Sequence, residues 1–224
     1  MGRSVPQRIM RVVLTRELIV HTAVELVERA GPDALSMRAV AEELGVSAMA
    51  TYRHVASKED LIEGMAEYVM ATLDVPDEQE ADWRDEARAL IRAFREIARE
   101  FPRSLALVLE SRTRIPVTLR AIERAVALCV RAGLDGPTAI AVMRSIMAFT
   151  LGAQLREAGL GRMLARDPGD PAEAVKALGE AEFPHVVAQR EALLDADADA
   201  DFEFGIALFL AAIEAKAAAL RDPR

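Results

Sequence analysis

Cysteine is almost absent from this chain of 224 residues, because Cys129 is the only one. A single thiol cannot form an internal disulfide or a thiolate metal cluster, and this usage suits a reducing cytoplasm. A signal peptide is also lacking, and the longest apolar stretch, near residues 204–213, is shorter than the ~20 residues that span a bilayer. The sequence therefore predicts a soluble, cytoplasmic protein that has no membrane partner.

Aromatic residues are scarce as well, at 4% of the chain, although hydrophobic residues reach 52%. Alanine, leucine and arginine dominate instead, and these residues favour helices over sheets. The net charge of −8 argues against a nucleic-acid partner. The charge distribution argues for one, because Arg3, Arg8, Arg11 and Arg16 precede the first acid, Glu17. We therefore expect an all-α protein with a flexible basic arm over residues 1–14.

Motifs of enzymes are missing. The chain contains no Gly-x-Ser-x-Gly, no phosphate-binding glycine loop and no metal-ligating pair among its histidines, which are His21, His54 and His185. Aspartates alternate over residues 195–201 as in a calcium loop, but alanine and isoleucine occupy the positions that require glycine and glutamate. We expect neither an enzyme, a cofactor nor a metal site, and we assign these aspartates to a loop and the N-cap of the last helix.

The stretch from Ser36 to Met65 carries the most specific pattern. Two short amphipathic helices, about 37–44 and 48–55, are predicted on either side of Gly45, which tolerates the left-handed backbone of a tight turn. Ser36 and Ser47 precede the two helices and can accept hydrogen bonds from their first-turn N–H groups. This arrangement predicts a helix-turn-helix over about 37–56, whose second helix would enter the DNA major groove.

Neighbouring segments complete a small domain over residues 15–73. Thr15 can cap a helix that runs to Ala30 and packs behind the helix-turn-helix. Ser57 can cap a further helix, with Asp60 completing the capping pattern. We expect this helix to continue to about Leu73 and to connect the domain to the rest of the chain.

Residues 74–224 are predicted to form a second helical domain. Its helices are expected over about 83–100, 105–109, 119–132, 138–157, 184–194 and 201–220. The helix over 138–157 is apolar nearly all round, which indicates a central helix or an interface, and the last helix has near-heptad apolar spacing. Glycines and prolines over 159–171 predict a long loop of the kind that can order on ligand binding.

The segment Tyr52-Arg53-His54-Val55-Ala56-Ser57-Lys58-Glu59-Asp60-Leu61 strongly resembles the DNA-binding domain of the TetR (tetracycline repressor) family. One departure is Thr51, where the family usually has Leu or Ile. Pieces of the second domain resemble the tetracycline-repressor branch: Asp82-Trp83-Arg84, Ala132-Gly133-Leu134, Phe149-Thr150-Leu151-Gly152 and Phe202-Glu203-Phe204-Gly205. The resemblance implies a homodimer joined by a four-helix bundle, with an effector pocket in each body and repression that the effector releases.

Base contacts are expected from the start of the second helix of the motif. Alanine and methionine there can make only apolar contacts, such as with thymine methyl groups. Arg38 is the best candidate for a bidentate bond to guanine, as the resemblance also implies, although it could simply be solvated. Tyr52, His54 and Lys58 suit phosphates, although His54 could be a core residue. The predicted DNA-binding residues are Ser36, Arg38, Ser47, Ala48, Met49, Ala50, Tyr52, His54 and Lys58.

Effector-pocket candidates lie near the segments that line the family's pocket. They are Phe94, Glu110, Arg112, Arg114, Met143, Met147 and Leu151. The charged candidates could equally be surface residues, and the methionines could belong to the core or to a dimer seam. No histidine lies between 55 and 184, where tetracycline-binding members carry a metal-chelating one, so a magnesium–tetracycline effector is not expected.

The leading hypothesis is a transcriptional repressor that binds a double-stranded DNA operator as a homodimer and is released by a small-molecule effector. The alternative is a helical ligand-binding or partner-binding protein whose helix-turn-helix does not bind DNA. The acidic total charge and the apolar Ala48-Met49-Ala50 tip favour this alternative. Salt-dependent DNA binding would separate the two, because phosphate contacts release counterions.

Overall fold

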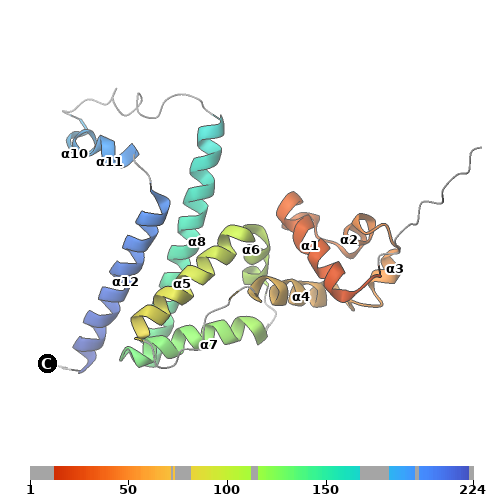
Figure 1. Cartoon of the computed structure of the whole chain (residues 1–224), viewed down its shortest axis with the longest axis horizontal. Helices are drawn as coiled ribbons and strands as arrows, with labels where there is room; N and C mark the ends of the chain where they lie inside the picture. Colours follow the sequence, from red (N-terminus) through yellow and green to blue (C-terminus); the bar gives the residue numbers. More distant parts are fainter. Residues whose placement is uncertain are drawn as a thin grey trace, which may run out of the picture. The chain divides into compact units, whose positions relative to one another are not determined.

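The computed structural model describes residues 13–71, 73, 82–111, 116–166, 182–194 and 197–221, and within these ranges all the regular structure is helical (Figure 1). The predicted all-α fold is therefore confirmed. Most of the predicted basic arm, residues 1–12, lies outside the described residues. The chain divides into two compact units, one of residues 1–71 and 101–117 and the other of residues 72–100 and 118–224. We call these the first unit and the second unit.

The first unit is built from short helices. They are α1 (Arg16–Ala30), the 3₁₀ turn η1 (Pro32–Ala34), α2 (Met37–Glu43), α3 (Ala48–Thr51), α4 (Lys58–Met70) and α6 (Pro102–Glu110). Every predicted cap forms: the hydroxyls of Thr15, Ser36, Ser47 and Ser57 accept hydrogen bonds from first-turn N–H groups at 3.1–3.3 Å. Each cap satisfies an N–H that has no partner inside the helix, which explains where these helices begin.

Small residues allow the helices of the first unit to pack closely. Gly64 on α4 faces α1, where an added Cβ would lie 2.6 Å from Cγ2 of Val20. Thr51 is fully buried, and its hydroxyl donates to the carbonyl oxygen of Ala48 at 2.7 Å. The departure at Thr51 is therefore accommodated, because the one polar group it adds to the core is hydrogen-bonded.

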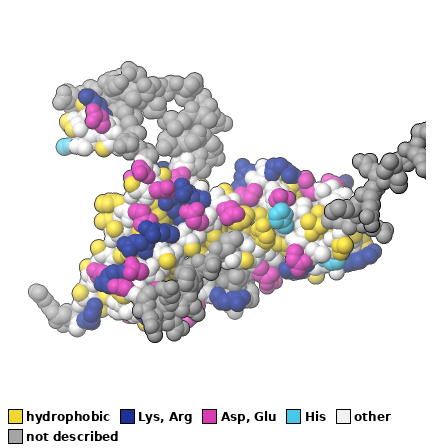
Figure 2. All heavy atoms as spheres, viewed as in Figure 1, with side chains coloured by type: hydrophobic (Ala, Val, Ile, Leu, Met, Phe, Trp, Pro, Cys, Tyr) yellow, Lys and Arg dark blue, Asp and Glu magenta, His cyan; other side chains and the backbone are white. Residues whose placement is uncertain are grey.

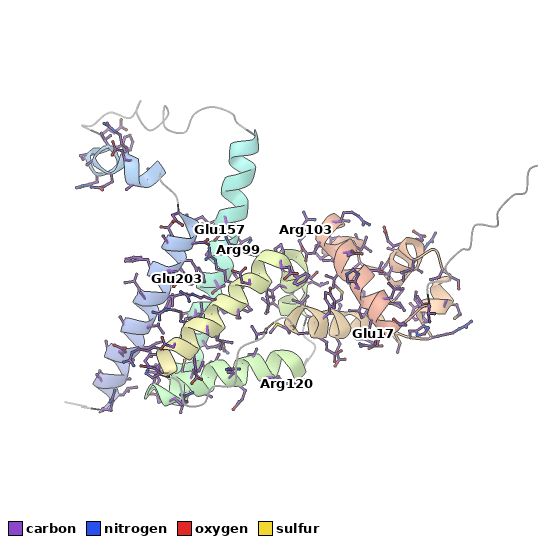
Figure 3. All side chains as sticks on the ribbon, in the orientation of Figure 1. Glu17, Arg99, Arg103, Arg120, Glu157 and Glu203 are labelled. Carbon is purple, nitrogen blue, oxygen red and sulfur yellow. The ribbon has the colours of Figure 1, made fainter. Side chains whose placement is uncertain are left out.

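α4 ends at Met70, before the predicted end at Leu73, and it packs against α1 and α6 within the first unit. α6 belongs by sequence to the predicted domain over 74–224, yet it packs with residues 13–71. A reciprocal clamp holds it there. Glu28 accepts from the backbone N–H of Ser104 at 2.7 Å, and Arg103 donates to the carbonyl of Glu28 at 2.8 Å (Figure 3).

The second unit consists mainly of longer helices. They are α5 (Trp83–Glu100), α7 (Pro116–Arg131, from residue 118 on), α8 (Gly136–Arg166), α10 (Pro184–Ala188), α11 (Arg190–Leu194) and α12 (Ala198–Arg221). α5, α8 and α12 pack against one another. One side of α12 supplies the centre of this core through Phe202, Ile206, Leu210, Ile213 and Ala217. Cys129 joins the same core, and burial raises the pKa of its thiol.

Several predicted boundaries were wrong. The helices expected from 105 and 119 begin earlier, at Pro102 and Pro116, because proline needs no hydrogen-bond partner in the first turn. The helix expected from 184 does begin at Pro184. α8 continues to Arg166, through part of the predicted loop over 159–171; the remainder of that loop lies outside the described residues. Glycine within a helix costs only about 1 kcal/mol relative to alanine, so the glycines there do not end α8.

Other predicted details are altered or confirmed. The single helix expected over 184–194 is divided at Gln189 into α10 and α11. Asp197 caps α12, since its Oδ1 accepts from the N–H groups of Asp199 and Ala200, both at 3.0 Å. The predicted N-cap is therefore confirmed at Asp197, but α12 begins at Ala198 instead of 201, so Asp199 and Asp201 lie in its first turn and not in a loop.

Candidate DNA-binding surface

The turn between α2 and α3 sets the direction of the second helix. Gly45 has a φ of 65°, which confirms the left-handed conformation expected there. The N–H of Val46 donates to the carbonyl of Ala41 at 3.0 Å, and the N–H of Gly45 donates to that of Glu42 at 3.1 Å. These two bonds close the end of α2 and hold the start of α3 against it.

α3 is shorter than predicted, because it ends at Thr51 instead of near Val55. The following turn is tighter, with the N–H of His54 donating to the carbonyl of Thr51 at 3.0 Å. Val55 is fully buried, and the N–H of Ala56 donates to Oδ2 of Asp60 at 2.7 Å. The chain passes through this turn into the capped start of α4 at Ser57.

The predicted base-contacting residues lie at an accessible tip. Met49 is 71% exposed and Tyr52 is 48% exposed, whereas Ala48 and Ala50 are half-buried. Ser36 and Ser47 are exposed; their oxygens accept the cap hydrogen bonds, so each hydroxyl can still donate to a phosphate. His54 and Lys58 are exposed, so His54 is not a core residue.

Arg38 is highly accessible on this surface, with a side chain that is 86% exposed. Its Nε donates to Oε1 of Glu42 at 2.8 Å, so the guanidinium has a protein partner in addition to solvent. Sequence reasoning missed Glu42 and also missed Arg53, which is exposed in the turn that follows α3. Their positions in the motif were a usable signal, since Glu42 follows Arg38 by one helical turn and Arg53 lies between Tyr52 and His54.

Ion pairs tie this surface to α1. Arg16 binds Oδ1 of Asp60 at 2.8 Å, and this bond, together with the N–H of Ala56, lowers the pKa of the Asp60 carboxyl. Arg29 binds Glu43 at 2.6 Å and so links α1 to the end of α2. Arg16 follows the predicted basic arm of residues 1–14, and its charge is paired inside the first unit.

The predicted effector-pocket residues fall in different parts of the molecule. Phe94 on α5 and Met143, Met147 and Leu151 on α8 are half-buried in the second unit, where α5 and α8 pack together. Glu110 is exposed on α6 in the first unit. Arg112 and Arg114 lie outside the described residues. A pocket formed by these residues stays a prediction.

A hollow of about 460 Å³ opens between α8 and α12. Phe149 stacks on Phe202 at its wall, with ring centroids 5.0 Å apart, and Arg156 binds Asp201 at its rim at 3.0 Å. The predicted pocket residues within the described ranges do not border it, although Arg156, which by sequence lies near the segments that line the family's pocket, does. The lining residues are Phe149, Gly152, Ala153, Arg156, Asp201, Phe202 and Phe204. The hollow is mostly apolar, and α12 next to it carries exposed hydrophobic side chains (Figure 2).

A buried charge cluster joins α5, α8 and α12. Arg95 is 5% exposed; its guanidinium binds Glu157 at 2.7 Å and Asp199 at 2.9 Å, and it lies over the ring of Phe202. Arg99 reaches the same Glu157 at 3.3 Å (Figure 3). The sequence offered no signal for this cluster, because its members are far apart along the chain.

Two buried polar atoms near this cluster lack hydrogen-bond partners among the described residues: Nε of Arg95 and Oε1 of Gln154. Gln154 lies one helical turn from Glu157 on α8, so both side chains point from the same side of that helix. One atom is a donor and the other an acceptor, and a hydroxyl group or water molecule could satisfy either of them.

Two segments of the chain each match a family of known proteins. Residues 19–65 match the family of bacterial regulatory proteins described as the tetR family, and residues 75–217 match the family described as tetracyclin repressor-like, C-terminal domain. The HTH-type transcriptional repressor DrrR1 of Streptomyces coeruleorubidus is 31% identical over 66% of this chain and 55% of its own length. The class A tetracycline repressor protein from transposon 1721 in Escherichia coli is 30% identical over 62% of this chain and 65% of its own.

The matched region thus spans less than two thirds of the length of these curated relatives. Among solved structures, apo ActR from Streptomyces coelicolor superposes with a TM-score of 0.75 at 25% identity, covering 93% of this chain and 99% of that chain. ActR has also been solved in complex with actinorhodin. The resemblance inferred from the sequence therefore extends over both units.

Proposed function

We propose that this chain, which belongs to the TetR family of bacterial transcriptional regulators, represses transcription by binding an operator as a homodimer and leaves it when an organic effector binds. The family is one of regulators and not of enzymes. Binding to chromosomal DNA implies an intracellular location. The observation that carries the proposal is the capped α2–α3 pair, which holds Arg38, Met49 and Tyr52 exposed together.

Each exposed group of the first unit suits one part of a DNA duplex. Arg38 can form two hydrogen bonds to a guanine, and Met49 can contact a thymine methyl group. Tyr52, His54 and Lys58 are placed to bind phosphates, which would fix the position of the motif without selecting a sequence. Lys58 opens α4, where its charge adds to the positive end of that helix.

The homodimer is supported by apolar surface that the second unit leaves uncovered. By length and composition alone, Gly136–Glu157 of α8 could cross a membrane, and only 11% of that stretch is buried within the chain. Two of its three charged residues, Arg156 and Glu157, pair with other helices of the same unit, and the third, Arg144, is exposed, which favours a protein partner over lipid. Exposed Phe204 and Leu208 extend the apolar surface onto α12. We propose that α8 and α12 pair with the same helices of a second copy.

Such a dimer would place two helix-turn-helix motifs on half-sites about 34–36 Å apart, or a multiple of that distance. An effector need only favour a dimer in which the motifs are wrongly spaced. Coupling of about 1–3 kcal/mol between the two sites is typical and changes operator affinity about 5- to 150-fold.

An organic effector is supported by the relative ActR, whose complex with actinorhodin has been solved. In this chain the half-buried Phe94, Met143 and Met147 and the buried atoms of Arg95 and Gln154 would offer an apolar surface with a few polar contacts. The histidine position argues against a magnesium–tetracycline effector, as the sequence also indicates.

The decisive experiment measures binding of the purified protein to DNA upstream of its own gene and to a scrambled duplex, at two salt concentrations. We expect the upstream duplex to bind at least about 10³-fold more tightly than the scrambled one, with affinity falling steeply as salt rises. Arg38→Ala should abolish most of that preference. Arg92→Ala is the matched control, since Arg92 is an exposed arginine of the second unit that pairs with Glu203.

Equal, weak binding to both duplexes at both salt concentrations would contradict sequence-specific repression at this site. No binding by a protein that is helical and dimeric would support the alternative, in which the chain binds ligands or partners without binding DNA.

A further inference from the structure

The charges on α2 are arranged against the helix dipole. A helix is stabilised by acids in its first turn and bases in its last turn, by about 0.3–1 kcal/mol each. α2 has the reverse arrangement, with no acid in its first turn and no base in its last. Arg38 lies near its start, and Glu42 and Glu43 lie at its end. Helix stability therefore does not explain these three residues.

Each of the three has a specific partner instead. Glu43 binds Arg29 and so joins α2 to α1. Glu42 accepts a hydrogen bond at 2.8 Å from Nε of Arg38, one turn earlier on the same face of α2. Among the described residues, neither terminal nitrogen of Arg38 has a partner. The Arg38 guanidinium is thus held through Nε, and its two terminal nitrogens can still donate hydrogen bonds to a base.

This geometry matters because arginine can offer guanine either of two donor pairs. The pair may be one terminal nitrogen with Nε, or both terminal nitrogens together, and the two modes place the base differently. With Nε engaged by Glu42, only the end-on mode is open. Restricting the long side chain before binding also reduces the rotamer entropy that it would lose in the complex.

We propose that Glu42 is a positioning residue for operator recognition, which acts by holding Arg38 in the end-on orientation toward a guanine. This inference rests on the proposed DNA-binding function. Glu42 would not touch the base itself. Its contribution would appear as discrimination between operator and unrelated DNA and would depend on Arg38.

The carboxylate of Glu42 has a second, separable effect, because a negative charge on this surface repels phosphates of any sequence. Removing the charge alone should therefore strengthen binding to every duplex. The ratio of the dissociation constants for scrambled and operator DNA cancels this general term and isolates the positioning of Arg38.

The experiment compares Glu42→Ala, Glu42→Gln and the matched control Glu43→Ala, each alone and combined with Arg38→Ala. Glutamine keeps an acceptor for Nε of Arg38 but carries no charge, whereas alanine keeps neither. A good arginine–guanine contact discriminates between the right and the wrong base by about 5- to 150-fold. We expect Glu42→Ala to lower the ratio of the two dissociation constants about three- to tenfold. Glu42→Gln should keep the wild-type ratio, and Glu43→Ala should keep it as well.

Three results would overturn the proposal: an unchanged ratio in Glu42→Ala, equal ratios in the alanine and glutamine variants, or the same loss when Arg38 is already alanine. The pairing is also testable without DNA, through the ¹⁵Nε–H resonance of Arg38. Glu42→Ala should shift this resonance and Glu43→Ala should not; a resonance that Glu42→Ala leaves unchanged refutes the contact. Failure of the wild-type protein to distinguish the two duplexes would instead refute the proposed function.

Discussion

The two units stabilise themselves in different ways. In the first unit the predicted caps are formed by neighbouring residues, and its ion pairs, such as Arg29–Glu43 and Arg38–Glu42, are exposed. In the second unit the long helices are joined by charges taken into the interior, as at Arg95, and their apolar residues are partly uncovered. The first unit therefore closes its own core, while the second leaves apolar surface that we propose a second copy covers.

Buried charges also have a different consequence from exposed ones. The attraction within a buried ion pair is offset by the cost of removing both charges from water, so such a pair adds little net stability. Removing one partner, however, leaves the other charge buried and unpaired. Glu86, which is 8% exposed and bound by Arg131 at 2.9 Å, is in the same situation as Arg95.

The largest effect should come from breaking the proposed pairing of second units. Phe204 is 66% exposed on α12, and Phe204→Asp would replace apolar surface with charge in both copies. Burial of one phenylalanine contributes about 1.5–3 kcal/mol, so two copies would lose about 3–6 kcal/mol of dimer stability. Sedimentation over a range of protein concentrations measures this loss of dimer stability. Phe183→Asp, at an exposed phenylalanine before α10, is the control. Equal dimer stability in the two variants would show that the surface around Phe204 is not part of the dimer interface.

A smaller effect tests the buried cluster. Glu157→Ala leaves Arg95 without its closest carboxylate, and breaking such a pair costs about 3 kcal/mol. Arg92→Ala removes an exposed pair with Glu203 and should cost less than about 1 kcal/mol. Urea unfolding of both variants gives the comparison. Similar, small losses of unfolding free energy in the two variants would show that breaking the buried pair costs no more than breaking the exposed one.

Next in size is the close approach of α8 and α12. A Cβ at Gly205 would lie 2.2 Å from Cζ of Phe149, whose ring is already packed on Phe202 and Phe209. Gly205→Ala should therefore destabilise the fold by about 2 kcal/mol through overpacking. Gly152→Ala has open space around it and should gain up to about 1 kcal/mol from helix propensity. Thermal unfolding compares the two variants, and a stabilised Gly205→Ala protein would show that Phe149 can move aside.

The smallest effect concerns the acid stability of the first unit. Arg16 and the N–H of Ala56 lower the pKa of Asp60, so its stabilising contribution is present above the pKa of an unfolded aspartate, about 3.9, and is lost as the pH falls through the folded value. Asp60→Asn should cost about 1 kcal/mol at neutral pH and flatten the fall in stability below about pH 4. Asp33→Asn, on the exposed turn η1, is the control. If Asp60→Asn leaves the fall in stability below about pH 4 unchanged, other carboxyl groups must cause that fall.

Local chemistry explains what the sequence predicted about the candidate site. Ser47 and Ser57 act on N–H groups within the next turn, and Gly45 needs only its own missing Cβ to adopt a positive φ. The positions of Arg38 and Met49 follow from these signals, and their exposure agrees with the prediction that they face DNA. Their contacts with DNA stay a prediction.

Features that depend on distant residues were missed. α6 joins the first unit, where Glu28 and Arg103 clamp each other from positions 75 residues apart. Arg95 and Glu157 are 62 residues apart. By itself, then, the sequence determined the helical fold, the capped helix-turn-helix and the family. Tertiary structure decided which unit holds α6 and which charges are buried, because those outcomes depend on partners that only packing brings within hydrogen-bonding distance.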